Sequence, residues 1–453
     1  MNSIQRSGEK DKGANGKIAR FCREYKVGNA YRASCGYVKS KGIAVMTLLQ
    51  YLLGLVFTGR TMYMNMLSDE AGFGKDSVYR LLKSVHTNWL RFTTLLCAEI
   101  IGKSVERLTG EERRNVLIVD DSLYERGRAK KAELLSRVYD HAKHRHTQGY
   151  RLLTLGWSDG NTFLPVNSCL LSGKEPLCEA KKTDKRTAGG QRRKLAQTKA
   201  TEAMLTLIRE AKRAKIPAKH VLFDSWFCFP SVVSKVKALG YEVVAMVKRM
   251  PNVTYICEGK AQTIQEIYQN HRKRRGMSRY KLSVEVTVES GEASFPARLV
   301  YVVNRNNRKD YLTILCTDMT MSEDEILQAY AKRWDIEVFF KMCKSYLRLT
   351  GEWKTLSYDA MTAGVAIVFV RYMLLAIKER NEQDPRTFGE LFYVCMDELP
   401  DINLAEALHR ILHIMHDVLV NDFGSNLFDA DRAVEIFVEK LPFELRNLLK
   451  SCA

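Results

Sequence analysis

The sequence predicts an α/β protein in which a mixed sheet flanked by helices is interrupted by a β-rich insertion, with helical regions at both ends. Between residues 115 and 248, short apolar runs alternate with amphipathic stretches, which is typical of buried strands and covering helices. Between residues 249 and 318, apolar and polar residues alternate with period two, as in antiparallel strands with one wet face. The remaining apolar runs have the helical period.

The chain is strongly basic. Its 71 Lys plus Arg against 52 Asp plus Glu give a formal net charge of +19. A surplus of this size suits a polyanion and favours nucleic acid over the alternative of a generically basic protein. A hydrophobic content of 46% excludes wholesale disorder. The eleven cysteines form no C-x-x-C pair and no cluster at zinc spacing, which predicts free thiols. The start lacks the apolar core of a signal peptide, so we expect these thiols in the cytoplasm.

The length of 453 residues allows two or three domains. We expect a division into five segments. They are a helical N-terminal DNA-binding region at 1–112, the first part of the α/β core at 113–248, the β-rich insertion at 249–318, the second part of the core with a charged helix at 319–380, and a C-terminal helical region at 381–453.

The N-terminal region is expected to be helical. Residues 42–59 are uncharged and just reach membrane-spanning length, but Gln50 and the terminal glycines favour a buried helix. Residues 64–85 have the rhythm of a helix-turn-helix, with a turn at 71–74 and a second helix opening at Lys75. That helix fits a major groove, although many helical pairs share the pattern. Its polar face carries Lys75, Ser77, Arg80 and Lys83.

The core elements follow in the order strand, strand, strand, helix, strand, helix, strand. We expect them at 115–121, at 149–171 as two strands around the turn 158–161, at 194–215, at 220–224, at 230–240 and at 241–248. Antiparallel strands are expected within 249–318, and helices from residue 323 onward. Within the last helices, Arg371 interrupts an apolar run, which favours a buried helix over a membrane span.

The stretch YAKRWDIEVFFKMCK, residues 330 to 344, is expected to form one helix. At about 100° per residue, offsets of 3, 7 and 14 bring its ionisable side chains into an arc about 60° wide, with Lys341 close by. The other residues are mostly apolar, so the helix is expected to be buried with one polar strip facing a polar site. The alternative is a packed helix with a salt-bridged edge. The strip consists of Tyr330, Arg333, Glu337 and Lys344.

Three carboxylates stand out by position: Asp120 and Asp224, which end two apolar strands, and Glu337 on the charged helix. If the two strands are neighbours, their aspartates lie side by side and repel unless a cation separates them. Two Mg²⁺ or Mn²⁺ ions meet that need and suit phosphodiester chemistry. For any one aspartate the alternative is a turn cap, and the adjacent Asp121 is the alternative first ligand.

The order of elements resembles the RNase H-like catalytic core of DDE transposases. The charged helix resembles the Y-x2-R-x3-E-x6-K (YREK) signature of bacterial transposases of the insertion sequence four family. The resemblance covers about residues 113–380. It implies that Asp120, Asp224 and Glu337 bind metal and catalyse. It also implies that Tyr330, Arg333 and Lys344, with the basic Lys341 beside them, hold the DNA backbone near the cleaved phosphate.

The resemblance further implies a DNA transposase that performs Mg-dependent cleavage and transfer of DNA strands. Its partners would be double-stranded DNA, comprising terminal inverted repeats and target, and a second copy of the chain in the DNA complex; no membrane is involved. We expect it in the bacterial cytosol, associated with the nucleoid. Some relatives use a Trp of the insertion to hold a flipped base, and no Trp lies between Trp226 and Trp334 here. Either Tyr255 or Tyr280 serves instead, or the hairpin mechanism differs.

Basic runs at 126–137, 181–194 and 271–280 are expected to contact the DNA backbone, with solvated surface as the alternative. His141, His144 and His146 lack partners at zinc spacing and indicate phosphate contact or surface exposure. Two other functions fit the fold: a catalytically decayed, transposase-derived DNA-binding protein, and an RNase H-like nuclease that cuts without joining. The intact signature disfavours decay, and fold alone does not separate the two enzymes.

Overall fold

The computed structural model describes residues 14–35, 42–58, 62, 72–106, 114–140, 143–274, 279–304, 310–352, 354–380 and 430–440. The chain divides into two compact units, Met1–Val302 with Tyr311–Pro385 and Val303–Asp310 with Arg386–Ala453. In the second unit, helix α17 (Ala430–Lys440) is described; the rest of the predicted C-terminal helical region lies outside the described residues. The five segment boundaries predicted from the sequence stay predictions, and the following paragraphs concern the first unit.

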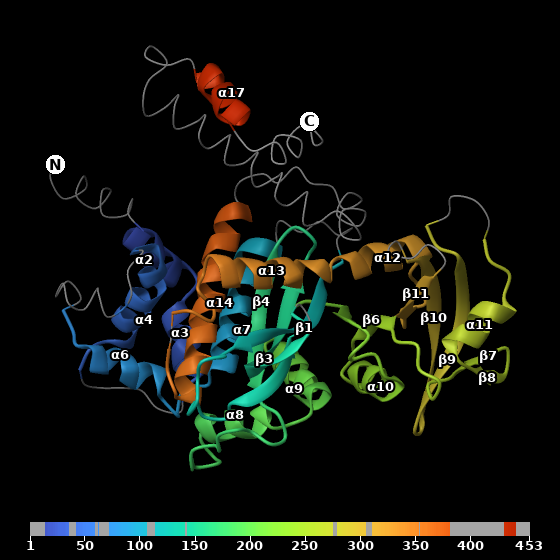
Figure 1. Cartoon of the computed structure of the whole chain (residues 1–453), viewed down its shortest axis with the longest axis horizontal. Coiled ribbons are helices and arrows are strands. Elements are labelled where there is room, and N and C mark those ends of the chain that lie inside the picture. The colour runs from blue at the N-terminus through green and yellow to red at the C-terminus, as the bar shows by residue number, and fades with distance from the viewer. Residues whose placement is uncertain are drawn as a thin grey trace. The chain divides into compact units, whose positions relative to one another are not determined.

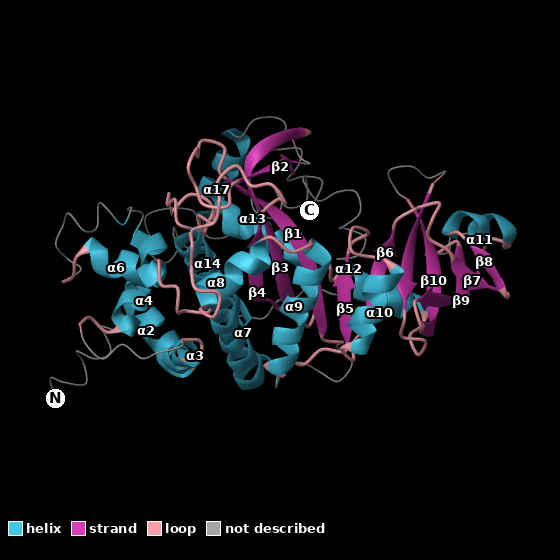
Figure 2. Cartoon of the chain, turned by 90° about the horizontal axis from the view of Figure 1, so that it is seen from below, coloured by secondary structure: helices cyan, strands magenta, loops and turns pink. Residues whose placement is uncertain are grey.

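A mixed sheet organises this unit (Figures 1 and 2). Among the described residues its strands run in the order β2-β3-β1-β5-β6-β11-β10-β9-β7-β8, with β4 paired to β3 outside this path. The strands are β1 (Val116–Glu125), β2 (Ser136–Asp140), β3 (Arg145–Ser158), β4 (Phe163–Leu171), β5 (His220–Phe223), β6 (Glu242–Val247), β7 (Tyr255–Cys257), β8 (Lys260–Gln262), β9 (Leu282–Ser290), β10 (Ala293–Val303) and β11 (Tyr311–Cys316).

The central strands have the RNase H-like arrangement β4-β3-β1-β5-β6. Strand β3 is antiparallel to both β1 and β4, whereas β5 is parallel to both β1 and β6. The parallel pairs form where the chain crosses over through α9 (Ala200–Arg213) and α10 (Pro230–Ala238). The predicted fold class, a mixed sheet flanked by helices, is therefore confirmed, as is the neighbour relation between the strands at 115–121 and 220–224.

The strand sequences explain their burial. Val116–Val119 at the start of β1 and the whole of β5 are apolar or uncharged and fully buried, as expected for strands covered on both faces. The predicted helix at 194–215 is instead two helices, α8 (Ala188–Ala196) and α9. They separate at 197–199, where the Thr198 hydroxyl donates to the Leu195 carbonyl and Lys199 takes an extended conformation.

The β-rich insertion continues the central sheet. Strand β11 pairs antiparallel with β6, and β10 with β9, so the insertion strands extend the sheet from its β6 side (Figure 2). Strand β9 alternates between buried and exposed residues, which confirms the predicted antiparallel strands with one wet face. The short helix α11 (Ile264–Asn270) begins with a capping box between Thr263 and Glu266.

Helices precede the sheet in the chain, as predicted. They are α2 (Ala14–Glu24), α3 (Val27–Ala33), α4 (Val45–Gly54), the short helix η1 (Leu55–Thr58), α6 (Lys75–Leu82), α7 (Trp89–Ile100) and η2 (Ile101–Val105). Helix α7 packs on β4 and on α14 (Tyr358–Arg380). The first helix of the predicted helix-turn-helix falls on residues 63–71, which lie outside the described part of the chain; the second is α6.

Among the described residues, one helical stretch, Tyr358–Ile377, is apolar and long enough to cross a membrane. Within the protein 72% of that stretch is buried. It also carries Arg371, whose side chain is fully buried and ion-paired with Glu352. Its Nη2 also donates to Glu352 at 2.9 Å and to the Leu52 carbonyl, and its Nε donates to the Leu53 carbonyl at 3.3 Å. This stretch is thus a core helix, as Arg371 predicted.

The stretch 330–344 is not one helix, contrary to the prediction. Helix α12 (Glu323–Ala331) ends before Lys332, and α13 (Trp334–Ser345) starts after Arg333. At this break the backbone hydrogen bonds join residues three apart instead of the four of an α-helix. The Arg333 N–H donates to the Tyr330 carbonyl, and the Asp335 N–H donates to the Lys332 carbonyl. The buried Lys332 ammonium donates to the Arg114 carbonyl at 2.5 Å, which anchors the break.

Candidate active site

Asp120 and Asp224 occupy matching positions on neighbouring strands. In the parallel register Val116 pairs with His220 and Ile118 with Leu222. Two residues beyond that last pair come Asp120 and Asp224, so the two carboxylates lie side by side. Asp224 follows the end of β5, as predicted, but Asp120 lies inside β1, because β3 continues to pair with β1 as far as Glu125.

The adjacent Asp121 points to the other face of the sheet, since successive strand side chains alternate. Its carboxylate accepts two hydrogen bonds from Arg151 of β3, from Nε at 2.6 Å and from Nη2 at 2.5 Å. Asp120 instead contacts Arg333 across the sheet face covered by α13. This geometry favours Asp120 over Asp121 as the first member of a carboxylate triad.

Arg333 joins Asp120 to Glu337. Its Nη1 lies 3.3 Å from Asp120 Oδ2, and its Nη2 lies 2.6 Å from Glu337 Oε1. Glu337 is in the first turn of α13, where the helix dipole favours a negative charge. The single guanidinium of Arg333 thus partly neutralises the negative charge of both carboxylates. In the described part of the chain, no three His, Cys, Asp or Glu side chains stand close enough as they lie to hold a metal ion.

Burial makes the aspartates of this site unusually basic. It raises the pKa of Asp120 to about 7; Arg333 opposes this shift, and the neighbouring Asp224 and Asp121 add to it. The pKa of Asp224 is raised as well, chiefly by burial, although the Trp226 N–H and Arg333 stabilise its charge. Desolvated carboxylates that repel each other attract a hard cation. The donor set of Asp120, Asp224 and Glu337 therefore fits a divalent metal in its ligand chemistry.

Tyr330 borders the same carboxylates from the end of α12. Its ring is buried, and its hydroxyl has no hydrogen-bond partner within the described residues. Burial raises the pKa of this hydroxyl, Arg333 lowers it, and Asp224 and Asp120 raise it further. The Arg333 guanidinium carbon lies 5.9 Å from the ring centroid. A buried hydroxyl without a partner, next to an arginine, is available to donate to a ligand oxygen.

Lys344, at the far end of α13, also reaches β1. Its Nζ donates to Ser122 Oγ at 2.6 Å, and Ser122 shares the face of Asp120. Burial lowers the pKa of Lys344, and the carboxylates of Asp140 and Glu125 partly restore it. Despite the break between α12 and α13, Arg333 and Lys344 therefore both reach the polar half of β1. Glu337 is paired with Arg333, and the Tyr330 ring lies beside the same arginine. Lys341 is exposed.

Two features beside these carboxylates were missed from the sequence. One is the Asp121–Arg151 pair, which depends on a strand register that the sequence did not reveal. The other is Trp226, which is 53% exposed although it is large and aromatic. Its backbone N–H donates to Asp224 Oδ1 at 3.0 Å, and Lys248 Nζ lies 4.9 Å from its ring centroid. The motif LFDSWF contained the signal, an aromatic two residues after the aspartate.

The predicted groove-reading helix is present as α6. It buries Val78, Leu81 and Leu82, as expected of its apolar face. On the other side Lys75, Arg80 and Lys83 are exposed and Ser77 is partly exposed. The described residues therefore keep this face available for a partner, and contact with DNA stays a prediction.

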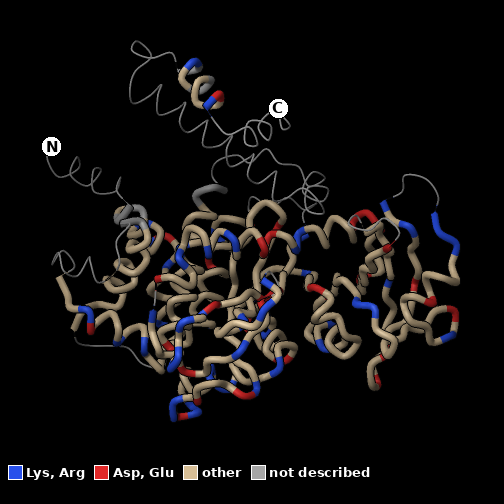
Figure 3. The backbone as a smooth tube through the Cα atoms, in the orientation of Figure 1, with Lys and Arg blue, Asp and Glu red and all other residues tan. Residues whose placement is uncertain are grey.

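The basic run at 181–194 is only partly on the surface. Arg193 is 6% exposed, and its guanidinium binds Glu133 and Asp359. Arg192 is 11% exposed and lies 3.3 Å from Asp359. These two arginines are structural. The remaining cations of the run are Lys194 within α8 and four residues in the loop before it, Lys181, Lys182, Lys185 and Arg186; Figure 3 shows how Lys and Arg are distributed along the chain. His144 and His146 are exposed; His141 lies outside the described residues.

A mixed sheet of this order is typical of RNase H-like nucleases when it has Asp120 on β1, Asp224 directly after β5 and Glu337 on the covering helix α13. A family model described as "DDE superfamily endonuclease" matches residues 44–299. Because this match spans more than half of the chain, the protein belongs to the DDE superfamily of endonucleases. The match includes Asp120 and Asp224 and ends before Glu337. A search of curated proteins finds no match to the chain.

Family membership indicates a nuclease or transposase whose substrate is DNA. Enzymes of this family generally use divalent metal ions, and the carboxylates described above have the hard oxygen donors that such ions prefer.

The nine cysteines that the structure describes are free, and most are buried, in agreement with the sequence prediction of unpaired thiols.

Proposed function

We propose that the protein is a DNA transposase of a bacterial insertion sequence, of the insertion sequence four type with the YREK signature. It binds the ends of the element and catalyses DNA strand cleavage and strand transfer. The observation that carries the proposal is the placement of Asp120 and Asp224 at matching positions of two neighbouring central strands, with Arg333 linking Asp120 to Glu337.

In this proposal Asp120, Asp224 and Glu337 hold two Mg²⁺ or Mn²⁺ ions. Bound there, the metals would supply an activated attacking oxygen and charge stabilisation at the leaving oxygen of a phosphodiester. Arg333 contacts both Asp120 and Glu337, so metal binding requires it to release at least part of these contacts. Its fork of donors is then free for phosphate oxygens, which it binds in pairs.

The remaining signature residues position the DNA strand. The Tyr330 hydroxyl is buried and has no partner in the described residues. In the complex it donates to a phosphate oxygen of the DNA backbone. Lys344 places a cation beside Ser122 on the same side of β1, and Lys341 adds charge at the exposed edge of α13. Trp226, whose backbone N–H donates to Asp224, adds an exposed aromatic ring beside this aspartate. Helix α6 contributes Lys75, Ser77, Arg80 and Lys83 to binding of the element ends.

The proposal includes a bacterial cytosolic location at the nucleoid and a homodimer that pairs two element ends. It is tested with the purified chain and DNA carrying the inverted repeats that flank its gene. We expect Mg²⁺-dependent cleavage at the repeat ends, and joining of the cut ends to a target plasmid. If no cut forms at these ends with Mg²⁺ or Mn²⁺, the proposal is wrong.

A second candidate is a nuclease on the same fold that cuts without joining, favoured by the description of the matched family as endonucleases. The same assay separates the two, because a nuclease yields cut ends and no joined product. A decayed DNA-binding protein would bind the ends and yield neither product.

A further inference from the structure

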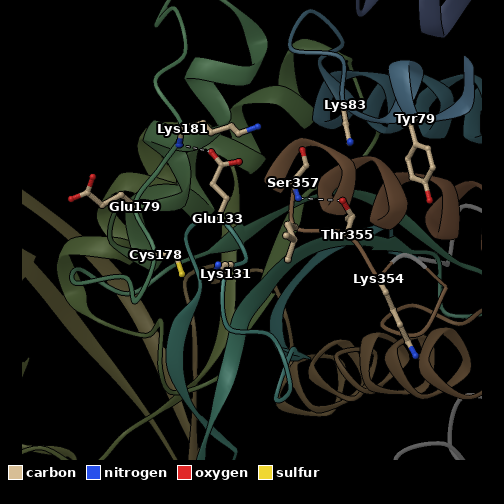
Figure 4. Close-up of a pocket in the computed structure, with 11 residues that line it drawn as sticks. Tyr79, Lys83, Lys131, Glu133, Cys178, Glu179, Lys181, Lys354, Thr355 and Ser357 are labelled. Carbon is tan, nitrogen blue, oxygen red and sulfur yellow. Dashed lines mark hydrogen bonds between the residues drawn. The ribbon is translucent and has the colours of Figure 1, made fainter. Parts of the chain in front are cut away.

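A second cationic feature of the protein shares no residue with the candidate active site of Asp120, Asp224 and Glu337. It is a cleft of about 530 Å³ whose walls come from segments that are distant in the sequence. Tyr79 and Lys83 come from α6 and the residue after it, Lys131 from the connection between β1 and β2, Lys181 from the loop before α8, and Lys354 from the segment before α14 (Figure 4). We call it the lysine cleft.

Among the residues that the structure describes, the lysines of this cleft have no anionic partner. All four are exposed, and within the described part of the chain none of their ammonium groups lies within ion-pair distance of a carboxylate. Lys83 Nζ lies 5.2 Å from the centroid of the Tyr79 ring. Four like charges around one cleft repel one another, and an anionic ligand relieves that repulsion.

The acidic residues of the cleft do not cancel its positive charge. Glu133 is buried and binds Arg193 through Nε at 2.7 Å and Nη2 at 3.1 Å. Arg193 and Arg192 together balance Glu133 and Asp359 in this buried network. Glu179 is therefore the one lining carboxylate without such compensation, against four lysines.

The same network holds the walls in place. Glu133 Oε1 accepts the Lys181 N–H at 2.8 Å, and Oε2 accepts the Tyr358 N–H at 3.2 Å. The Glu133 N–H donates to the Leu356 carbonyl at 3.0 Å. Glu133 thus ties its own segment to the Lys181 loop and to the segment before α14, so three of the four lysines are presented by a preformed frame, which lowers the entropic cost of binding.

We propose that the lysine cleft is an accessory binding site for consecutive phosphates of a DNA strand, separate from the carboxylate site. It is open and lined by flexible ammonium groups, which bind phosphates as point charges without reading sequence. Because Lys83 directly follows α6, DNA that lies along this helix is positioned to enter the cleft. The inference rests on the proposed function in that DNA is taken as the substrate.

The test measures the salt dependence of binding of the full chain to a short duplex by fluorescence anisotropy. Each phosphate contact contributes about −0.9 to the slope of log K against log salt. The Lys131→Gln/Lys181→Gln variant, which leaves Lys83 and the α6 face unchanged, should therefore bind with a slope shallower by about 1–2 and roughly tenfold more weakly at moderate salt. Lys131→Arg/Lys181→Arg, which keeps the charge, should retain the slope.

A control with the same loss of charge is Lys199→Gln/Lys215→Gln, at the two ends of α9 outside the cleft; its slope should equal that of the unaltered chain. Glu179→Gln removes the uncompensated carboxylate and should tighten binding. Equal slopes for the cleft variant and the unaltered chain, or an equal change in the α9 control, would overturn the inference.

Inorganic phosphate distinguishes the source of the ligand. If millimolar phosphate at constant ionic strength raises the melting temperature through these lysines while the DNA slope is unaffected, the cleft binds free phosphate and the inference is wrong. Cleavage measured in the same preparations separates the two proposals. Mg²⁺-dependent cutting with an unchanged slope refutes only the cleft, whereas a chain that neither binds nor cuts DNA refutes both.

Discussion

Arg333 sets the state of the candidate active site at the scale of single residues. It binds Asp120 and Glu337 together, and its removal leaves two carboxylates without their shared cation. Burial already raises the pKa of Asp120 to about 7, so an unpaired Asp120 would hold its proton more strongly. The arginine thus favours the ionised form of Asp120 that a metal ion needs, in addition to its proposed phosphate contact.

The first prediction separates the two adjacent aspartates. Asp120→Asn should lower the rate of Mg²⁺-dependent cleavage at least about a hundredfold, because a metal ligand is lost. DNA binding should persist, because the phosphate contacts remain. The matched control is Asp121→Asn, which removes the partner of Arg151 on the other face and should retain cleavage once its folding is verified. Loss of cleavage in Asp121→Asn alone would reverse the assignment.

A second prediction concerns the phosphate contact of Arg333. Arg333→Gln should weaken binding of pre-cleaved ends and make the salt slope shallower by about one. An uncut duplex that does not reach the carboxylates should be affected less. The readout is anisotropy on both DNAs, and equal effects on the two would contradict a contact at the cut end.

At the scale of elements, the sequence predicted the strands well where one signal dominated. The apolar runs VLIV and HVLF are followed by carboxylates. The second run placed β5 correctly, whereas the first predicted only the start of β1, which continues to Glu125. The break between α12 and α13 was missed because its cause is tertiary: Lys332 binds the Arg114 carbonyl, and Asp335 accepts from Ser158 Oγ at 2.6 Å. No helical periodicity contains that information.

The buried ion pair of α14 gives a third prediction. Arg371 is 0% exposed, and its partner Glu352 is also buried. Arg371→Leu leaves a buried carboxylate unpaired and should lower the free energy of unfolding by about 3–5 kcal/mol. The double variant Arg371→Leu/Glu352→Leu should be less destabilised than the two single changes combined. Urea denaturation measures this, and strict additivity would argue against direct coupling.

The start of β5 gives a prediction on pH. His220 is buried, and its Nε2 lies 2.8 Å from Asp318 Oδ2, while its Nδ1 has no partner in the described residues. Burial lowers the pKa of His220, although Asp318 partly opposes the shift. Below about pH 6.5 the unfolded chain binds a proton at this histidine that the folded chain excludes, so stability falls as pH falls.

His220→Asn should therefore flatten the loss of stability between pH 6.5 and the lower pKa of the folded state. The difference in slope should reach up to about 1.4 kcal/mol per pH unit. The exposed His146 provides the control, since His146→Asn should leave the profile unchanged. Parallel urea profiles for His220→Asn and the unaltered chain would contradict a buried neutral histidine.

At the scale of the whole molecule, the sequence predicted a core and an insertion but not that they form one sheet. Strand β11 pairs with β6 across the whole insertion, and such long-range pairing leaves no local pattern. The same limit applies to the lysine cleft, because Lys131 and Lys181 were predicted as parts of separate basic runs. The net positive charge of the chain predicted a polyanionic partner. Where lysines from distant parts of the sequence come together is visible only in the fold.

Metal binding should appear as a property of the whole molecule, independent of catalysis. A ligand that binds only the folded state stabilises it by RT ln(1 + [L]/Kd), about 2.7 kcal/mol at a concentration of 100 Kd. We therefore expect the melting temperature to rise steadily with Mn²⁺ concentration, because the ion relieves the repulsion between Asp120 and Asp224. Differential scanning calorimetry at constant ionic strength measures the shift, and the Asp120→Asn/Asp224→Asn variant should show none. Asp121→Asn, which keeps the three proposed ligands, should respond like the unaltered chain. An equal rise in all three proteins would mean that the ion binds elsewhere, and the carboxylates would then need another explanation for their burial.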